Sequence, residues 1–308
     1  MPENFMPKLK RVFSRILKNF RFLLSRDIRD IDDQSTQNQK QIKEQSQQIK
    51  EQSQQIKEQS QENLFLLKTC FDRDPWLAKS KDLHKGERCF LLGCGPSLNK
   101  VDLSLLKGQH IMGVNGTILI DTIELEYFVS VSNYWWKQHI EPLIAHRCKR
   151  RFLPLFIDGI DSDCPTTWLR VIDIRHHRRL TDANPWFFST EADRYVVLGG
   201  SVIIVCLQIL YHLGFSEVVI LGLDHDYGFE DDKLKKKGGM YLKSENIVAH
   251  FTNDYYPVGV DVHLDIGAME RGYQLAHDAF INDGRKILNA SPGTKLEIFP
   301  KVEYNLLF

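Results

Sequence analysis

Residues 199–224 place an almost wholly apolar helix directly before an almost wholly apolar strand. Gly199-Gly200-Ser201 opens the helix Val202–Leu213, Gly214 closes it, and the run Val218–Leu221 follows. A helix without a polar face and a strand without alternation must both be buried on all sides. A sheet with helices on both of its faces meets that requirement. The sequence therefore predicts an α/β domain with a mostly parallel sheet.

The same order of strand, glycine-rich turn and helix recurs over residues 80–308. It predicts a Rossmann-like domain whose ligand site lies at the carboxyl ends of the strands. The other expected elements are short apolar, β-branched or aromatic runs and two longer amphipathic stretches. The expected strands are Arg88–Leu92, His110–Val114, Tyr127–Val131, Arg151–Phe156, Val171–Ile174, Val218–Leu221 and Lys286–Asn289, and the expected helices are Asn133–Ala145, Val202–Leu213 and Gly267–Asp283.

Two further segments precede this domain, and the first is strongly basic. The chain of 308 residues has a net charge of zero, but residues 1–29 carry eight basic and two acidic side chains, a charge of +6. Apolar residues recur there at helical spacing, so residues 1–30 are expected to form a basic amphipathic helix. Such a helix suits an anionic membrane surface, which residues 5–26 would contact. The alternatives are docking on protein and a frayed tail.

Residues 31–68 contain a heptad repeat. The seven residues Gln41–Gln47 recur at 48–54 and 55–61, and Ile42, Ile49 and Ile56 occupy one core position in each heptad. The second core position is glutamine, which predicts a marginal helical stalk that associates with copies of itself. A polar low-complexity spacer is the other interpretation.

Composition excludes several classes of protein. No run of about 18 uncharged apolar residues is present, which argues against a transmembrane helix, and basic residues interrupt every candidate signal sequence. The six cysteines form neither a C-x-x-C pair nor a metal-ligand spacing. We therefore expect a cytoplasmic protein, peripheral on the inner face of the membrane if its basic helix binds lipid. No nucleic-acid partner is expected.

Two glycine-rich turns are the first candidates for ligand binding. Gly93-Cys94-Gly95-Pro96-Ser97 follows the apolar run that ends at Leu92. Glycines permit a sharp turn and close approach of a ligand, and Pro96 suits a helix start. The turn is neither a dinucleotide fingerprint nor a P-loop. Gly199, Gly200 and Ser201 open the apolar helix, whose N-terminus favours phosphate, and Ser201 also suits a simple N-cap.

Carboxylates and a histidine supply the candidate chemistry. Asp224 and Asp226 follow the strand that ends at Leu221. They suit a base, a sugar contact or Mg²⁺ ligands, and Asp224 also suits a structural cap on the loop that follows it. His250 lies with Tyr255 in an aromatic, acidic segment and is the best general-base or phosphate-contact candidate of eleven histidines. No resident cofactor is indicated, and Mg²⁺ enters only through Asp224 and Asp226.

These motifs, together with the ending Leu288–Gly293 and Phe299–Tyr304, resemble the MptE-like domain family over residues 85–308. That family is similar to archaeal 6-hydroxymethylpterin diphosphokinase and to motility-associated-factor glycosyltransferases, and more distantly to bacterial sialyltransferases that use CMP-activated sugar. The resemblance implies that Gly93, Gly95, Pro96 and Ser97 line a nucleotide. It also implies contacts from Asn115 and Asn133 to nucleotide or donor sugar, from Gly199–Ser201 to phosphate, and a base near His250. Cys94 replaces an asparagine of the sialyltransferase turn.

The sequence thus predicts a transferase that binds a nucleotide or nucleotide-activated sugar and moves a glycosyl group onto an acceptor in surface-glycan or glycoconjugate synthesis. Two alternatives stay open. One is an ATP-dependent pyrophosphokinase acting on 6-hydroxymethylpterin, with Asp224 and Asp226 holding Mg²⁺. The other is a non-catalytic scaffold that senses a nucleotide.

Overall fold

The computed structural model divides the chain into two compact units, residues 1–71 and 72–308. The structure describes a part of each unit. The described residues are residue 14 and residues 40–55, 73–131, 133–157, 160, 163–173, 187–227, 240–243, 250–251, 259 and 261–308.

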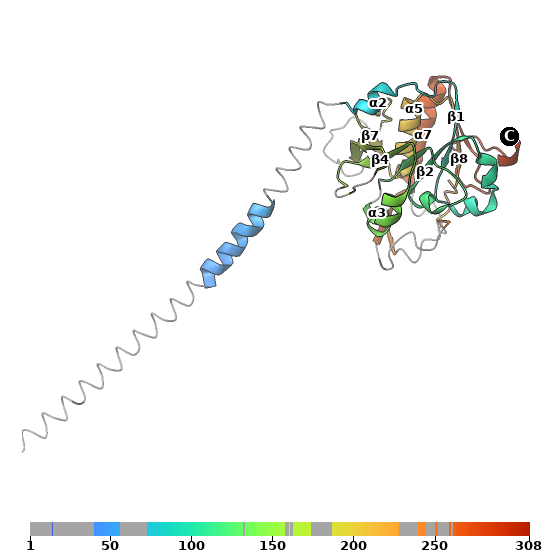
Figure 1. Ribbon diagram of the computed structural model, residues 1–308. Coiled ribbons are helices and arrows are strands. Elements are labelled where there is room, and N and C mark those ends of the chain that lie inside the picture. Colours follow the sequence, from blue (N-terminus) through green and yellow to red (C-terminus); the bar gives the residue numbers. More distant parts are fainter. Residues whose placement is uncertain are drawn as a thin grey trace, which may run out of the picture. The chain divides into compact units, whose positions relative to one another are not determined.

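In the first unit, residues 40–55 form a helix through two of the heptads (Figure 1). Ile42 and Ile49 are each 62% exposed, because a lone helix has no partner for its apolar positions. This agrees with the helical interpretation of these heptads, and their self-association stays a prediction. Of the expected basic helix over residues 1–30 only Ser14 is described, so that prediction lies outside the described residues.

The second unit is built on a sheet of seven parallel strands, which confirms the predicted α/β, Rossmann-like fold class. The strand order is β11-β8-β1-β2-β3-β4-β5. The central strands are buried along nearly their whole length, as their continuous apolar runs require. The strands are β1 (Arg88–Leu92), β2 (His110–Val114), β3 (Tyr127–Val129), β4 (Arg150–Pro154), β5 (Thr166–Leu169), β8 (Glu217–Leu221) and β11 (Lys286–Asn289).

Helices pack on both faces of this sheet. Phe128 on β3 packs against Trp135 of α3, whereas its neighbour Tyr127 packs against Trp76 of α2. Successive strand residues point to opposite faces, so α2 and α3 cover opposite sides. Figure 1 shows α5 and α7 side by side. The α-helices are α2 (Pro75–Lys79), α3 (Asn133–Gln138), α4 (Ile140–Ala145), α5 (Val202–His212) and α7 (Ile266–Asn282).

Shorter elements complete the domain. Two small sheets are formed by β6 (Val171–Asp173) with β7 (Val196–Leu198) and by β9 (Met240–Lys243) with β10 (Asp261–Leu264). The 3-10 helices are η1 (Pro96–Lys100), η2 (Leu103–Leu106), η3 (Asn115–Leu119) and η5 (Tyr304–Leu307). Among the described residues, no helix combines the length and the apolar character that crossing a membrane requires.

One expected helix is broken. The prediction of a single helix over Asn133–Ala145 is wrong, because α3 ends at Gln138 and α4 begins at Ile140. Pro142 explains the break: it has no N–H to donate to the carbonyl of Gln138, and its ring would clash with that carbonyl in a continuous helix. Four short strands, β5, β7, β9 and β10, were not predicted, since three- or four-residue segments carry too few positions to show a period.

Candidate functional site

The order in which strands are added to the main sheet reverses at β1. From β1 the chain continues to β2 on one side, whereas β8 lies on the other side of β1 and leads on to β11. The connections that follow β1 and β8 therefore lead to strands on opposite sides of this point, β2 on one side and β11 on the other. In open parallel sheets this switch point is where ligands bind. The turn at Gly93 and the turn at Gly222 both begin here.

These two turns are packed directly against each other. Gly93 N donates to Leu221 O at 2.7 Å, and Gly95 N donates to Gly222 O at 2.8 Å. A Cβ at Gly93 would lie 2.5 Å from Gly222 O, and one at Gly95 would lie 2.7 Å from the same oxygen. Both glycines are thus required by the close approach of two backbones. Their amides already have partners within the protein.

Asp224 holds the start of the 3-10 helix after the glycine turn. Ser97 N donates to Asp224 Oδ2 at 2.8 Å, and Ser97 Oγ donates to Asp224 Oδ1. A carboxylate that accepts amide bonds at a helix start acts as a cap. Asp224 therefore caps η1, whereas the structural role expected from the sequence was a cap on the loop that follows Asp224. The Ser97 amide and hydroxyl are both engaged by it.

An Asp224→Ala variant is expected to lower the free energy of unfolding by about 2–5 kcal/mol, since loss of a helix cap costs roughly 0.5–2 kcal/mol and loss of a hydrogen bond to a charged group roughly 1.5–3 kcal/mol. Urea denaturation of Asp224→Ala, Ser97→Ala and the double variant measures the coupling. We expect the double variant to be little worse than Asp224→Ala. Strictly additive losses would show that the two side chains do not act as a pair.

The turn after β2 lies on the other side of the glycine turn. Asn115 is 3% exposed and has a φ of 43°, a left-handed conformation that asparagine tolerates better than most residues. Backbone strain of this kind is concentrated at functional sites. Cys94 Sγ donates to Val114 O at 3.3 Å, which ties the two turns together. The hydroxyls of Thr117 and Ser130 are buried near the ends of β2 and β3, and neither has a hydrogen-bond partner among the described residues.

His250 is brought to this same edge by its neighbour Phe251. Phe251 N donates to Cys94 O at 2.7 Å, and Asn99 Nδ2 donates to Phe251 O at 3.3 Å. The Phe251 ring lies 3.5 Å from where a Cβ on Gly116 would be. Burial lowers the pKa of His250 to about 3, so its imidazole is neutral at pH 7. A neutral imidazole suits a proton acceptor better than a cationic phosphate contact.

The lowered pKa of His250 predicts a loss of stability in acid. The unfolded chain takes up a proton below its ordinary pKa of 6.5, whereas the folded chain resists protonation down to about pH 3. Stability should therefore fall as pH decreases from 6.5, by at most about 1.4 kcal/mol per pH unit from this group. In His250→Gln the slope measured by urea denaturation between pH 6.5 and 4.5 should be shallower. An unchanged slope would contradict the burial of the neutral ring.

Gly199, Gly200 and Ser201 open α5, and Ser201 is its N-cap, as predicted. Gly200 has a φ of 97°, and the Ser201 hydroxyl accepts from Ile203 N at 3.3 Å as the N-cap. Burial raises the pKa of Tyr273 to about 12, although a hydrogen bond with Ser201 opposes the shift. Ile203 N is engaged by this cap, and Ile204 N donates to Ser201 O at 3.2 Å, so amides of this N-terminus are also engaged. The N-terminus of α5 still favours a negative charge through the helix dipole.

Three predicted site residues remain, namely Asp226, Asn133 and Tyr255. Asp226 forms an ion pair with Lys295 at 2.9 Å, and both side chains are about half exposed. Asn133 begins α3 after β3, as expected, but only its backbone is described. Tyr255 lies outside the described residues.

A second polar cluster, which no motif indicated, lies at the opposite edge of the sheet. It comprises His84, Glu87, His110 and Glu126. The sequence could have indicated this cluster only through the positions of its residues relative to the strands. Glu87 precedes β1, His110 begins β2 and Glu126 precedes β3. Polar residues at the amino ends of three consecutive parallel strands meet at one edge.

Comparisons of the chain with protein families, with curated proteins and with solved structures found no match. The candidate site is therefore defined by its geometry alone.

Proposed function

We propose that the protein binds a nucleotide-activated sugar at the carboxyl edge of its main sheet and transfers the glycosyl group to an acceptor. The observation that carries the proposal is the bond from Phe251 N to Cys94 O, 2.7 Å long, which holds His250 beside the glycine turn at the switch point. The candidate base His250 thereby directly precedes a residue that is bonded to the glycine turn after β1. The strained Asn115 lies in the adjoining turn.

The chemistry requires a proton acceptor and a stabilised leaving group. Glycosyl transfer forms a bond from an acceptor oxygen to the anomeric carbon and breaks the bond from that carbon to the nucleotide phosphate. His250, neutral because burial lowers its pKa to about 3, would take the acceptor's proton. The departing phosphate gains negative charge, which the N-terminus of α5 (Val202–His212) would stabilise. The resemblance to glycosyltransferases of the MptE-like and sialyltransferase groups supports the donor class.

The contacts of the carboxylates do not favour the pyrophosphokinase alternative. Both oxygens of Asp224 accept from Ser97, and Asp226 is paired with Lys295. Mg²⁺ would have to share the oxygens of Asp224 with Ser97 and compete with the Lys295 ammonium for Asp226 before it could hold a pyrophosphate. Mg²⁺-dependent release of AMP from ATP in the presence of 6-hydroxymethylpterin would overturn the choice of glycosyl transfer.

A donor-hydrolysis assay tests the proposal. Purified full-length protein is incubated with CMP-, UDP- and GDP-sugars, and release of free nucleotide is followed with and without a mixture of glycan and lipid-linked acceptors. We expect release from one nucleotide class, and faster release with an acceptor. Release from none of the donors would contradict the proposal. Full cellular function of the double variant His250→Ala, Asp224→Ala would instead support the non-catalytic scaffold.

The membrane and self-association proposals concern the first unit. We propose that residues 5–26 contact an anionic membrane and that the heptads bring copies of the chain together there. The exposed Ile42 and Ile49 in the helix of residues 40–55 support the second point. Sedimentation with anionic and neutral vesicles, comparing the full chain with one lacking residues 1–30, tests the first.

A further inference from the structure

The amino edge of the main sheet brings two imidazoles and two carboxylates into contact. Glu87 precedes β1, His110 begins β2 and Glu126 precedes β3, and these strands are neighbours in the sheet. His84 comes from the turn just before Glu87. This edge is opposite to the one that carries the candidate transferase site, so the cluster is a separate feature of the domain.

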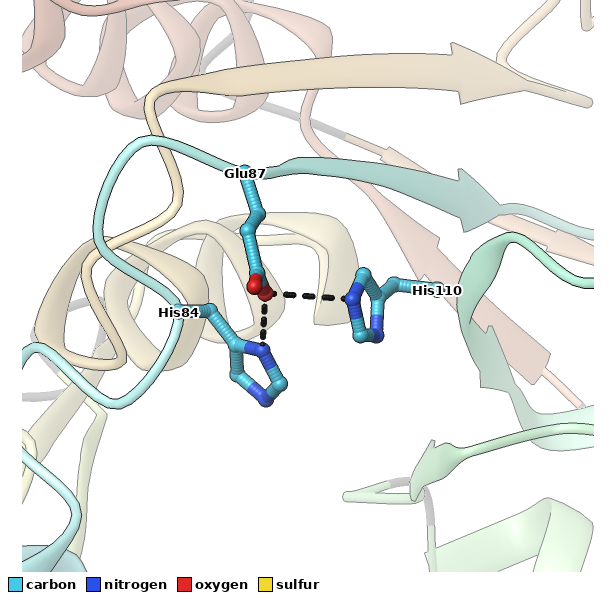
Figure 2. A group of neighbouring side chains, drawn as sticks. All are labelled: His84, Glu87 and His110. Carbon is cyan, nitrogen blue, oxygen red and sulfur yellow. Dashed lines mark hydrogen bonds and ion pairs between the residues drawn. The ribbon is translucent and has the colours of Figure 1, made fainter.

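Three donor atoms of this cluster converge on one point. His84 Nδ1 lies 2.5 Å from Glu87 Oε2, and His110 Nε2 lies 3.1 Å from the same oxygen (Figure 2). One ligand atom from each of these three residues lies within 4.8 Å of the other two. Two imidazole nitrogens and one carboxylate oxygen form a donor set that zinc uses in proteins, with a fourth position for water.

The second nitrogen of each imidazole is held by another group. Tyr127 Oη lies 2.8 Å from His84 Nε2, and Glu126 pairs with His110 Nδ1. Lys149 Nζ in turn donates to Glu126 at 2.7 Å. When the outer nitrogen carries the proton, the inner nitrogen turns a lone pair toward Glu87. Metal-binding histidines in proteins are typically oriented in this way.

Packing and exposure also suit a bound ion. The Phe215 ring stacks on His84 with centroids 4.4 Å apart and meets the His110 ring edge-on at 5.5 Å, so both rings are held in place. The His84 side chain is only 6% exposed, whereas those of His110 and Glu87 are 35% and 48% exposed. The point of convergence is therefore rigid on its inner side and open to solvent on its outer side, which leaves an entry path.

We propose that His84, Glu87 and His110 bind one divalent transition-metal ion of the zinc type, with Glu126 and Tyr127 orienting the two imidazoles. The ion takes the place of any proton held between an imidazole and Glu87, which is released to solvent, and each imidazole keeps its proton on the outer nitrogen. Water fills the fourth position. The ion links the turn before β1 to the start of β2, so its binding stabilises the folded chain.

Titration of Zn²⁺ into chelator-stripped full-length protein, in competition with a chromophoric zinc chelator, tests the site. We expect one strong equivalent in the wild type and a higher melting temperature with Zn²⁺, with no such effect of Mg²⁺. Glu87→Gln and His110→Gln should lose the strong equivalent. Glu126→Gln, which alters an orienting group, should weaken it by roughly 10–100-fold. The matched controls Glu297→Gln and His277→Gln change partly exposed residues elsewhere and should bind as the wild type does.

Circular dichroism verifies that each variant is folded. Glu87 is half exposed, so Glu87→Gln keeps the test decisive even where His110→Gln does not fold. A cluster that serves only as a hydrogen-bond network predicts no strong Zn²⁺ equivalent in the wild type. That result would overturn the proposal, as would undiminished Zn²⁺ binding by folded Glu87→Gln, which would assign the ion to other side chains.

Discussion

A His250→Gln variant is expected to lose about 10²-fold in kcat for glycosyl transfer, while its affinity for the nucleotide changes little. General-base catalysis contributes roughly 10²–10⁴-fold, and a base of low pKa takes up a proton less readily, which places His250 at the lower end. Because burial lowers the pKa of His250 to about 3, its neutral form persists through the usual titration range of histidine. The rate should therefore show no acid limb near pH 6.5 from this group.

Steady-state kinetics of transfer between about pH 5 and 8 measure both effects. His277→Gln is the matched control, because His277 lies on α7 and contacts Asp278 instead of the glycine turn. Equal losses in the two variants would show that the change is not specific to the site. An unaltered kcat in His250→Gln would remove the proposed base.

A Gly222→Ala variant is expected to lower the free energy of unfolding by about 2–5 kcal/mol. Gly222 has a φ of 71°, and an added Cβ would lie 2.8 Å from both Gly93 O and Leu98 Cγ. The left-handed conformation costs a non-glycine residue roughly 1–2 kcal/mol, and forcing the two turns apart costs roughly 1–3 kcal/mol more. Chemical denaturation followed by circular dichroism gives the value.

Gly108→Ala isolates the steric part of this loss. Gly108 has a φ of 80°, close to that of Gly222, but an added Cβ there would meet nothing within 4 Å. It should therefore show the conformational cost alone. If the two variants lost the same stability, the turns after β1 and β8 would not be as closely packed as their hydrogen bonds indicate.

The fold could be predicted because segments that are buried on all sides consist almost wholly of apolar residues. Strands β1, β2 and β11 have the bounds expected from the sequence, and α5 differs from its expected range by one residue. The class followed from the apolar helix and strand around Gly214, which can only be buried on all sides. Interruptions that depend on one residue, such as the break before Pro142, are harder to predict because the apolar period continues through them.

The candidate site was predictable in position more than in detail. Motifs that follow strand ends must gather at one edge of a parallel sheet, so Gly93, Asn115 and Asp224 were expected together. A single sequence does not indicate which side chains pair with each other in the folded chain. The capping of Ser97 by Asp224 and the docking of Phe251 on Cys94 both join residues more than 120 positions apart. The cluster of His84, Glu87 and His110 was not predicted for the same reason.

Calorimetric titration of the full-length protein with CMP-, UDP- and GDP-sugars tests most directly whether the carboxyl edge is a nucleotide-sugar site. We expect one donor class to bind at one site per chain. Asn115→Asp keeps the size of the side chain but adds a negative charge near the expected phosphates, and it should bind about tenfold or more weakly. Asn282→Asp, at the exposed end of α7, should bind as the wild type does. Binding by none of the donors, or equal binding by Asn115→Asp and the wild type, would contradict a donor site at this edge.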